Sequence, residues 1–180
     1  MTHAQAQKEL SALRTNENIS IDGQLQETEW KNADVATSFL ERNPTEGNSP
    51  RFKTEVRVLY DDDNIYVLGY CFDDHPDSIL TQLGERDDIG GRNTLNTDVF
   101  TVSFDTYNKM LDAFTFAVSA SGVQADSRIS DDSFNAVWES AVQIVEDGWI
   151  VEIRIPYYAI RFPKGERQIW RVYRLTLRHN

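Results

Sequence analysis

The stretch AVWESAVQIVEDGWIVEIRIPYYAIRF, at residues 136–162, predicts two β-strands joined by a tight turn. The turn falls at Glu146, Asp147 and Gly148, because an Asp-Gly pair readily supplies the positive φ angle that a short hairpin requires. After the turn, an apolar side chain stands at every second position of residues 149–155. In a strand this spacing places the apolar side chains on one face, and Pro156 then closes the strand. The stretch therefore predicts a β-hairpin with one apolar face.

Apolar patterns along the rest of the chain predict an all-β protein. The predicted strands lie at residues 19–21, 53–60, 65–72, 99–104, 113–119, 138–145, 149–155 and 168–177. Several strands carry apolar residues at both odd and even positions, so apolar side chains point to both faces of the strand. This indicates that both faces are covered. A short helical turn at residues 27–33 is predicted to bury Trp30. We therefore expect a β-sandwich of two antiparallel sheets.

The length and composition of the chain fit a single domain. Its 180 residues are enough to enclose a hydrophobic core, and we predict one β-sandwich at residues 19–180 after a flexible segment at 1–18. The net charge of −11 opposes binding to nucleic acids and to anionic membrane surfaces, since both would repel the chain. The single cysteine, Cys71, lies in an apolar run, which favours a buried core thiol over a nucleophile.

A second informative motif lies near the start of the chain, where residues 21–30 read IDGQLQETEW. It is followed in order by segments at residues 56–67, 96–105, 114–118, 122–126 and 136–162. Taken in this order, the motifs resemble those of the family 9 carbohydrate-binding modules and of the wider DOMON-like group of β-sandwich domains. The resemblance spans residues 19–177 and extends to the module at the N-terminus of outer-membrane β-barrel proteins of Gram-negative bacteria.

The resemblance implies a jelly-roll-like sandwich that binds an oligosaccharide or polysaccharide and has no catalytic activity. It also implies a place at the cell surface or in the periplasm, with an outer-membrane barrel as the C-terminal partner. Two features of the sequence agree with an exported domain that was excised from a larger protein. Residues 1–18 are polar and contain no signal peptide, as expected of an exported domain whose signal has been removed. The alternating strand at 170–177 ends three residues before the chain does, as expected where a domain is cut from a larger protein.

Acidic side chains near predicted strand ends are candidates for a structural calcium site, which the resemblance also implies. If the two sheets pack in alignment, hairpin connectivity brings several loops to one rim of the sandwich. Calcium takes about six to eight oxygen ligands from carboxylates, amides and carbonyls. The candidate ligands are Asp73, Asp74, Asn96, Asp98 and Asp126. The alternative is that these residues only form turns, as Asp and Asn commonly do in β proteins.

The same rim supplies planar polar and aromatic side chains of the kind that bind sugars. Sugar hydroxyls pair with planar polar groups, and the C–H faces of a sugar ring pack on aromatic rings. The predicted ligand-binding residues are Arg86, Asn96, Arg128, Trp138, Glu152 and Tyr157. For Trp138 the alternative is a core position, and for Glu152 it is a cross-strand ion pair. The loop at 83–97 contains no aromatic residue, although well-known family members hold a terminal sugar between two tryptophans.

Two other functions compete with glycan binding. An interaction or plug domain of an outer-membrane barrel would explain why the loop at 83–97 has no tryptophan. A glycoside hydrolase would require two carboxylates with separate roles, about 5–10 Å apart, and no carboxylate in the sequence stands out by an apolar setting. We therefore expect a non-catalytic domain. Binding to a panel of glycans would separate the carbohydrate-binding module from the interaction domain.

Overall fold

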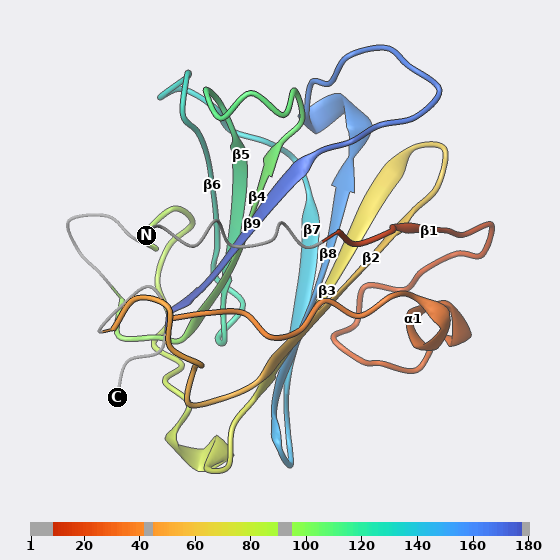
Figure 1. The fold of residues 1–180 in the computed structure, drawn as a ribbon. Helices are drawn as coiled ribbons and strands as arrows, with labels where there is room; N and C mark the ends of the chain where they lie inside the picture. Colours follow the sequence, from red (N-terminus) through yellow and green to blue (C-terminus); the bar gives the residue numbers. More distant parts are fainter. Residues whose placement is uncertain (1–8, 42–44, 90–94, 178–180) are drawn as a thin grey trace, which may run out of the picture.

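The computed structural model describes residues 9–41, 45–89 and 95–177, and its strands form two sheets that face each other (Figure 1). The larger sheet has five strands in the order β1-β2-β3-β8-β7. Their bounds are β1 Leu13–Arg14, β2 Thr54–Tyr60, β3 Asn64–Phe72, β7 Glu139–Val145 and β8 Gly148–Pro156. Neighbouring strands of this sheet are antiparallel except for β1, which pairs with β2 in parallel.

The smaller sheet has four strands in the order β6-β5-β4-β9, each antiparallel to its neighbours. Their bounds are β4 Val99–Asp105, β5 Phe114–Ser119, β6 Gln124–Arg128 and β9 Arg171–Leu177. The two packed sheets confirm the predicted all-β sandwich. The sheets are antiparallel as predicted, apart from the two-residue strand β1, which pairs with β2 in parallel, and β6 was not among the predicted strands.

The predicted hairpin forms as β7 and β8 of the larger sheet. Val145 pairs with Gly148, so the residues between them make the turn. Gly148 has a φ of +147°, and a Cβ atom there would lie 2.1 Å from the carbonyl oxygen of Cys71 on β3. The position therefore requires glycine, both for its backbone conformation and because β3 approaches so closely.

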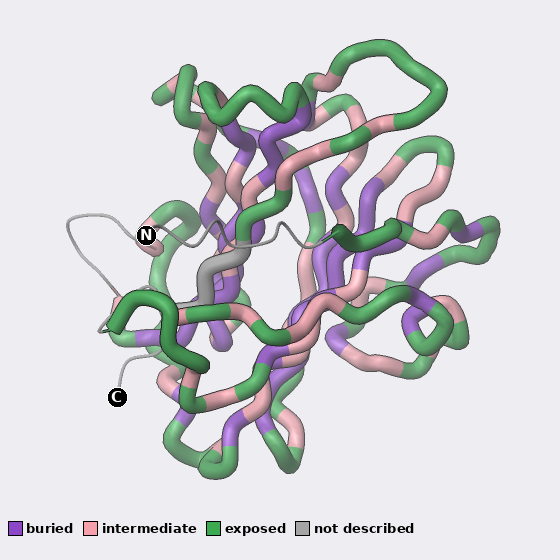
Figure 2. Tube along the Cα trace, viewed as in Figure 1, coloured by how far each residue is buried: buried purple, intermediate pink, exposed green. Residues whose placement is uncertain are grey.

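The main hydrophobic core lies between the two sheets, where the purple segments of Figure 2 face each other. It includes Val67 and Cys71 from β3, Phe100 from β4, and Trp149 and Ile153 from β8, each with 0% exposure. Successive side chains of a strand point to opposite faces, so alternate residues of β3 and β8 reach this core. The burial of Cys71 confirms the predicted core thiol.

A second hydrophobic cluster covers the outer face of the larger sheet, on the side away from the smaller sheet (Figure 1). Here the N-terminal segment, which runs from β1 to the helix α1 at Thr28–Asn32, packs against Ile150 of β8. Trp30 of α1 is completely buried, as predicted for the short helical turn. The predicted strand at 19–21 is wrong, because Ile19 joins this cluster from a loop that is not paired as a strand.

Strand pairing sorts the loops into two ends, which we call the η1 end and the η2 end after the 3₁₀ helices η1, Pro76–Ser78, and η2, Tyr157–Ala159. The η1 end contains the end of β3, the β7–β8 turn, the start of β4 and the β5–β6 turn. The η2 end contains the β2–β3 turn, the β4–β5 loop and the end of β6 (Figure 1). The single predicted rim is therefore divided, since Asp73 and Tyr157 lie at opposite ends.

Two further features concern the chain as a whole. Of the predicted flexible segment at 1–18, residues 1–8 lie outside the described part, while Leu13–Arg14 form β1. Within the described residues, no helix is both long enough and apolar enough to cross a membrane. The two helices of the sandwich proper, η1 and η2, have only three residues each.

Candidate functional site

Arg86 reaches from the loop after η1 to the edge strand β6, where it joins several polar groups. Its Nη1 donates a hydrogen bond of 2.6 Å to Oε1 of Gln124, and its Nη2 donates one of 2.9 Å to the carbonyl oxygen of Ala136. Nη2 also pairs with the carboxylate of Asp126. The guanidinium carbon lies 5.7 Å from the centre of the Trp138 ring. The fold thus brings three predicted site residues, Arg86, Asp126 and Trp138, to one edge of the smaller sheet.

Asp126 is the centre of this polar cluster, and its side chain is only 1% exposed. Its Oδ2 accepts a hydrogen bond of 2.8 Å from the N–H of Ala136, and its Oδ1 accepts one of 3.0 Å from Nε1 of Trp138. Together with Arg86, these donors satisfy and neutralise the carboxylate, as the burial of a charge requires. Asp126 therefore does not fit a calcium ligand, and its predicted role at a metal site is corrected.

An open pocket of about 430 Å³ lies beside Arg86, at the β5–β6 turn. Its walls include Leu83, Arg86, Ser121, Gly122 and Gln124. Guanidinium and amide groups can bond sugar hydroxyls, and the exposed side chain of Leu83 offers an apolar contact. Ser121 and Gln124 were not singled out from the sequence. The available clue was Gly122, which marks a turn and has a φ of +85°.

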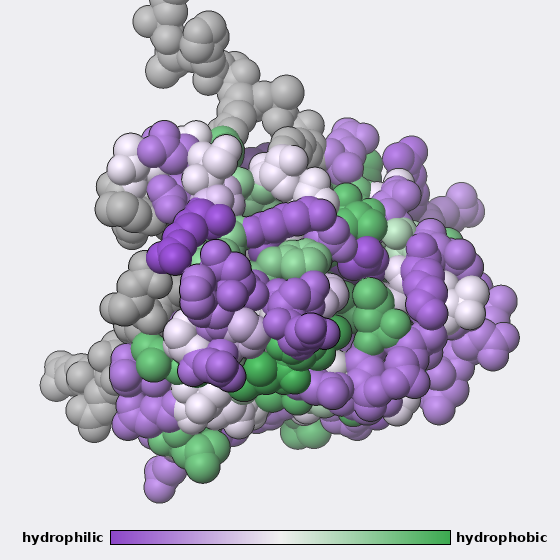
Figure 3. Space-filling view, turned by 90° about the horizontal axis from the view of Figure 1, so that it is seen from below, coloured by the Kyte–Doolittle hydropathy of each residue, from purple (hydrophilic) through white to green (hydrophobic). Residues whose placement is uncertain are grey.

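Asn96 lies at the same end of the sandwich, which Figure 3 shows as a mostly hydrophilic surface with some hydrophobic side chains exposed between. Its N–H donates a hydrogen bond of 2.7 Å to Oε1 of Gln82. The neighbouring Asp98 is buried, and its backbone bonds to Leu80 and to Ala120. These hydrogen bonds connect the start of β4 to the loop after η1 and to the β5–β6 turn, and so hold these segments together at the η1 end.

Trp138 is a core residue rather than an exposed aromatic platform. Its side chain lies below the guanidinium of Arg86, and the residue is 5% exposed. Its ring packs edge-to-face against Phe116, with 5.3 Å between the ring centres. A sugar ring has no access to either face in this arrangement. The predicted ligand role of Trp138 is therefore corrected, and the alternative of a core position holds.

Arg128 and Tyr157 lie at the η2 end, away from the Arg86 pocket. Arg128 forms an ion pair of 2.8 Å with Asp112. Burial alone would raise the pKa of the Asp112 carboxyl, but hydrogen bonds from Arg128 and Ser130 lower it overall. Burial, and then the charge of Asp61, raise the pKa of Tyr157 to about 12. The two residues therefore belong to η2-end contacts, and the structure does not join them to Arg86.

Glu152 is completely buried on the outer face of β8, beneath the N-terminal segment. Its Oε2 accepts hydrogen bonds of 2.9 and 2.8 Å from the N–H groups of Asp22 and Gly23. Its Oε1 accepts one of 2.7 Å from Nε1 of Trp30. Burial raises the pKa of Glu152 to about 7. The predicted ligand role is corrected, because the N-terminal segment covers the carboxylate that the strand pattern places on a polar face.

The predicted calcium ligands do not form one set. Among the described residues, the only group of three potential ligand residues within 4.8 Å consists of Asp73, Asp74 and His75. Neither Asp98 nor Asp126 belongs to such a group, and the oxygens of Asp126 are occupied by protein donors. Calcium therefore stays a prediction from the resemblance, and the described residues do not bring Asp98 and Asp126 into one group with Asp73 and Asp74.

The sequence matches the family model described as Carbohydrate family 9 binding domain-like over residues 21–169. Among solved structures, the fold is similar to a family 9 carbohydrate-binding module from Caldicellulosiruptor kristjanssonii in complex with cellotriose, with a TM-score of 0.54 and 15% identity. That match covers 81% of this chain, which spans 66% of the other, just under two thirds. No curated protein matches the sequence.

A family 9 module from the same organism in complex with glucose is similar to the same extent, with a TM-score of 0.56 and 14% identity. This match covers 81% of this chain and 69% of the other. At such low identity, the two solved structures establish a shared fold. The family match extends from the IDG motif past the β7–β8 hairpin and covers most of the sequence. The chain therefore belongs to the carbohydrate family 9 binding domain-like family.

Proposed function

We propose that this chain is a non-catalytic carbohydrate-binding module. The observation that carries the proposal is the family match over residues 21–169, which includes every strand of the two sheets except β1 and β9. The structurally similar family 9 modules are described in complex with cellotriose and with glucose. We therefore take oligosaccharides of neutral sugars as the ligand class. Export to the cell surface or periplasm is part of the same proposal and is supported by the sequence resemblance.

We place the binding site at the Arg86 pocket. The contacts of Arg86 with Asp126 and Ala136 hold its guanidinium in one orientation before a ligand arrives, which reduces the entropy lost on binding. Gln124 is held in turn, because its Nε2 donates a hydrogen bond of 2.8 Å to Oγ of Ser140. Two planar groups with fixed orientation and an exposed apolar neighbour, Leu83, suit the hydroxyls and C–H face of a sugar.

Calorimetric titration with cellotriose and glucose tests the proposal. The chain is expected to bind at least one of them, and Gln124→Ala is expected to weaken that binding about tenfold, since one good hydrogen bond contributes about 1.4 kcal/mol. Gln143→Ala is the matched control, because Gln143 is exposed on β7 and does not line the pocket. Equal affinities of the two variants would contradict the placement of the site.

Titration of a broad glycan panel extends this test to the whole proposal. A folded sample that binds no glycan in the panel would contradict the module and favour the interaction domain of an outer-membrane protein instead. A melting curve for each variant separates the loss of a contact from the loss of the fold.

A further inference from the structure

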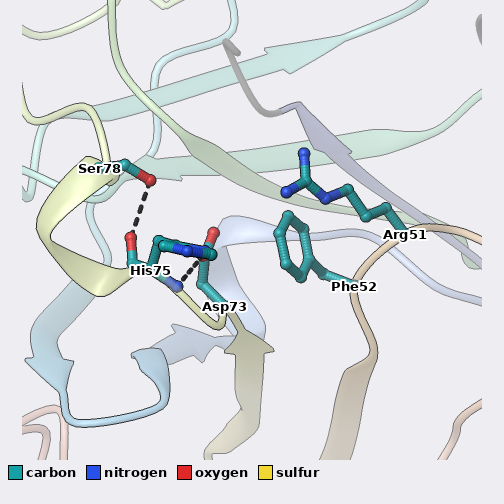
Figure 4. Close-up of a pocket in the computed structure, with 5 residues that line it drawn as sticks. All are labelled: Arg51, Phe52, Asp73, His75 and Ser78. Carbon is teal, nitrogen blue, oxygen red and sulfur yellow. Dashed lines mark hydrogen bonds between the residues drawn. The ribbon is translucent and has the colours of Figure 1, made fainter.

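A second pocket, of about 250 Å³, opens at the η1 end between the start of β2 and η1 (Figure 4). It is lined by Arg51, Phe52, Asp73, His75 and Ser78. In Figure 4 the rings of His75 and Phe52 lie on opposite sides of the hollow, and Arg51 lies beyond Phe52. None of these residues lines the Arg86 pocket, so the two pockets are separate.

Strand register and local turns hold the walls of this pocket in place. Thr54 of β2 pairs with Cys71 of β3, so the residues just before β2 lie beside those just after β3. Asp73 donates its N–H to the carbonyl oxygen of Asp147 at 2.9 Å. Its Oδ1 accepts a hydrogen bond of 2.8 Å from the N–H of His75. The pocket therefore lies where the chain enters β2 and leaves β3, and hydrogen bonds hold the first residues of the β3–β4 connection in place.

The groups in this pocket combine an aromatic wall with polar side chains that suit hydroxyl groups. The guanidinium carbon of Arg51 lies 4.7 Å from the centre of the Phe52 ring, so the two side chains form one stacked wall. Nδ1 of His75 lies 2.7 Å from Oδ1 of Asp74, which leaves the other ring nitrogen for a ligand. Ser78 donates its hydroxyl to the carbonyl oxygen of His75, and its oxygen can still accept.

The size and charge of the pocket narrow the class of ligand. Its volume of about 250 Å³ lies below the range of about 300–1,000 Å³ for drug-sized ligands, so it suits a single sugar ring. The lining contains the carboxylate of Asp73 and the guanidinium of Arg51, the carboxylate of Asp74 lies beside the His75 ring, and the net charge of the chain is −11. An acidic sugar would be repelled by this balance of charges, whereas a neutral one would not.

We propose that this pocket is a second carbohydrate site, which binds one neutral pyranose unit independently of the Arg86 pocket. The inference takes its ligand class, neutral sugars, from the proposed function, but it concerns a different set of residues. Both pockets open at the η1 end, so the domain presents two sugar-binding positions on one end of the sandwich.

Amide chemical shifts of the ¹⁵N-labelled chain, titrated separately with glucose and glucuronate, test the proposal. Glucose is expected to shift the signals of Asp73, His75 and Ser78, and to do so equally in the Gln124→Ala variant. Glucuronate is expected to bind at these signals at least about fivefold more weakly, because the surrounding carboxylates oppose its charge.

Two pocket variants complete the test. Arg51→Gln and Phe52→Leu are each expected to weaken the binding of glucose at these signals about fivefold or more, while Arg161→Gln, an exposed residue at the η2 end, leaves it unchanged. Shifts confined to Ser121 and Gln124 would overturn the second site and leave the proposed function standing. Absence of glucose shifts at both pockets would overturn the second site, and the proposed function would fall with it only if cellotriose also failed to bind in the calorimetric titration. Equal binding of glucuronate would overturn the assignment to a neutral sugar.

Discussion

At the scale of single residues, Glu152 fixes the N-terminal segment to the larger sheet. Its carboxylate accepts three hydrogen bonds, from Asp22, Gly23 and the indole of Trp30, and the residue is completely buried. Hydrogen bonds to a buried carboxylate are stronger than neutral ones, and a missing partner there is costly. The IDG motif and the strand β8 are therefore linked through one side chain.

The raised pKa of Glu152 predicts a pH dependence of stability. Its pKa is about 7 in the folded chain against 4.5 for the free group, because burial disfavours the charged form. Its contribution to the unfolding free energy is therefore greatest below pH 4.5 and declines as the pH rises to about 7, by on the order of 3 kcal/mol. Urea titrations of the wild type and of Glu152→Gln at several pH values measure this difference. A difference that stays constant or increases with pH would contradict the prediction.

Gly69 on β3 predicts a specific sensitivity of the core. A Cβ atom at this position would lie 2.5 Å from Cε2 of Phe100, whose ring is completely buried between the sheets. Gly69→Ala is therefore expected to lower the unfolding free energy by about 1–3 kcal/mol, since the core has no room for the added methyl group. Gly165→Ala serves as the control, because its Cβ would meet only ordinary contacts at 3.5 Å or more. Similar urea midpoints for the two variants would argue against the close contact.

At the scale of elements, the N-terminal segment acts as a cover for one face of the larger sheet. Without it, Leu68 and Ile150 would face solvent on the outer side of β3 and β8. The helix α1 has only five residues and would not be stable alone, so its contacts with the sheet stabilise it. The segment is therefore part of the folded domain.

Trp30 is among the largest fully buried side chains of the chain and belongs to this contact. Trp30→Ala is expected to lower the unfolding free energy by about 3–5 kcal/mol, because it removes a completely buried ring and leaves Glu152 without one donor. Lys31→Ala, at an exposed position on the same helix, is expected to change it by less than about 0.5 kcal/mol. Denaturation curves followed by circular dichroism compare the two. A loss below about 1 kcal/mol for Trp30→Ala would show that the segment is dispensable.

Elements differ in how far their sequence predicts them. The β7–β8 hairpin was predictable, because an Asp-Gly turn separates two alternating patterns. The strand β6 was missed because its sequence, QADSR, has almost no apolar residues and is held by backbone pairing with β5. Residues 19–21 alternate between apolar and polar side chains as a strand does. Their apolar side chains pack in the outer hydrophobic cluster, but the segment does not pair in a sheet.

The candidate site was less predictable than the strands for a physical reason. Arg86, Asp126 and Trp138 were each selected from the sequence, but the ion pair that centres the cluster joins Arg86 to Asp126, which lie 40 positions apart in the sequence. A sequence pattern reports which face of a strand a side chain occupies. It does not report that a loop will cross that face, as happens at both Trp138 and Glu152.

At the scale of the whole molecule, excess negative charge is expected to oppose folding. The chain has a net charge of −11 on 180 residues, and its negative groups repel one another more strongly in the compact chain than in the unfolded one. The unfolding free energy is therefore expected to rise when sodium chloride increases from about 20 to 200 mM, because salt screens this repulsion. Urea denaturation at the two salt concentrations measures the change. A fall in stability would instead show that screened ion pairs, such as Arg128 with Asp112, outweigh the net repulsion.

The β5–β6 turn also determines how readily the domain can acquire new ligands. Ser121 on this turn and the facing Leu83 line the Arg86 pocket, yet neither belongs to a buried cluster of the sandwich. Substitutions at positions that do not stabilise the fold can change the ligand specificity of a domain during evolution. A display library randomised at these two positions should therefore yield variants with altered sugar preference, whose melting temperatures stay close to that of the parent.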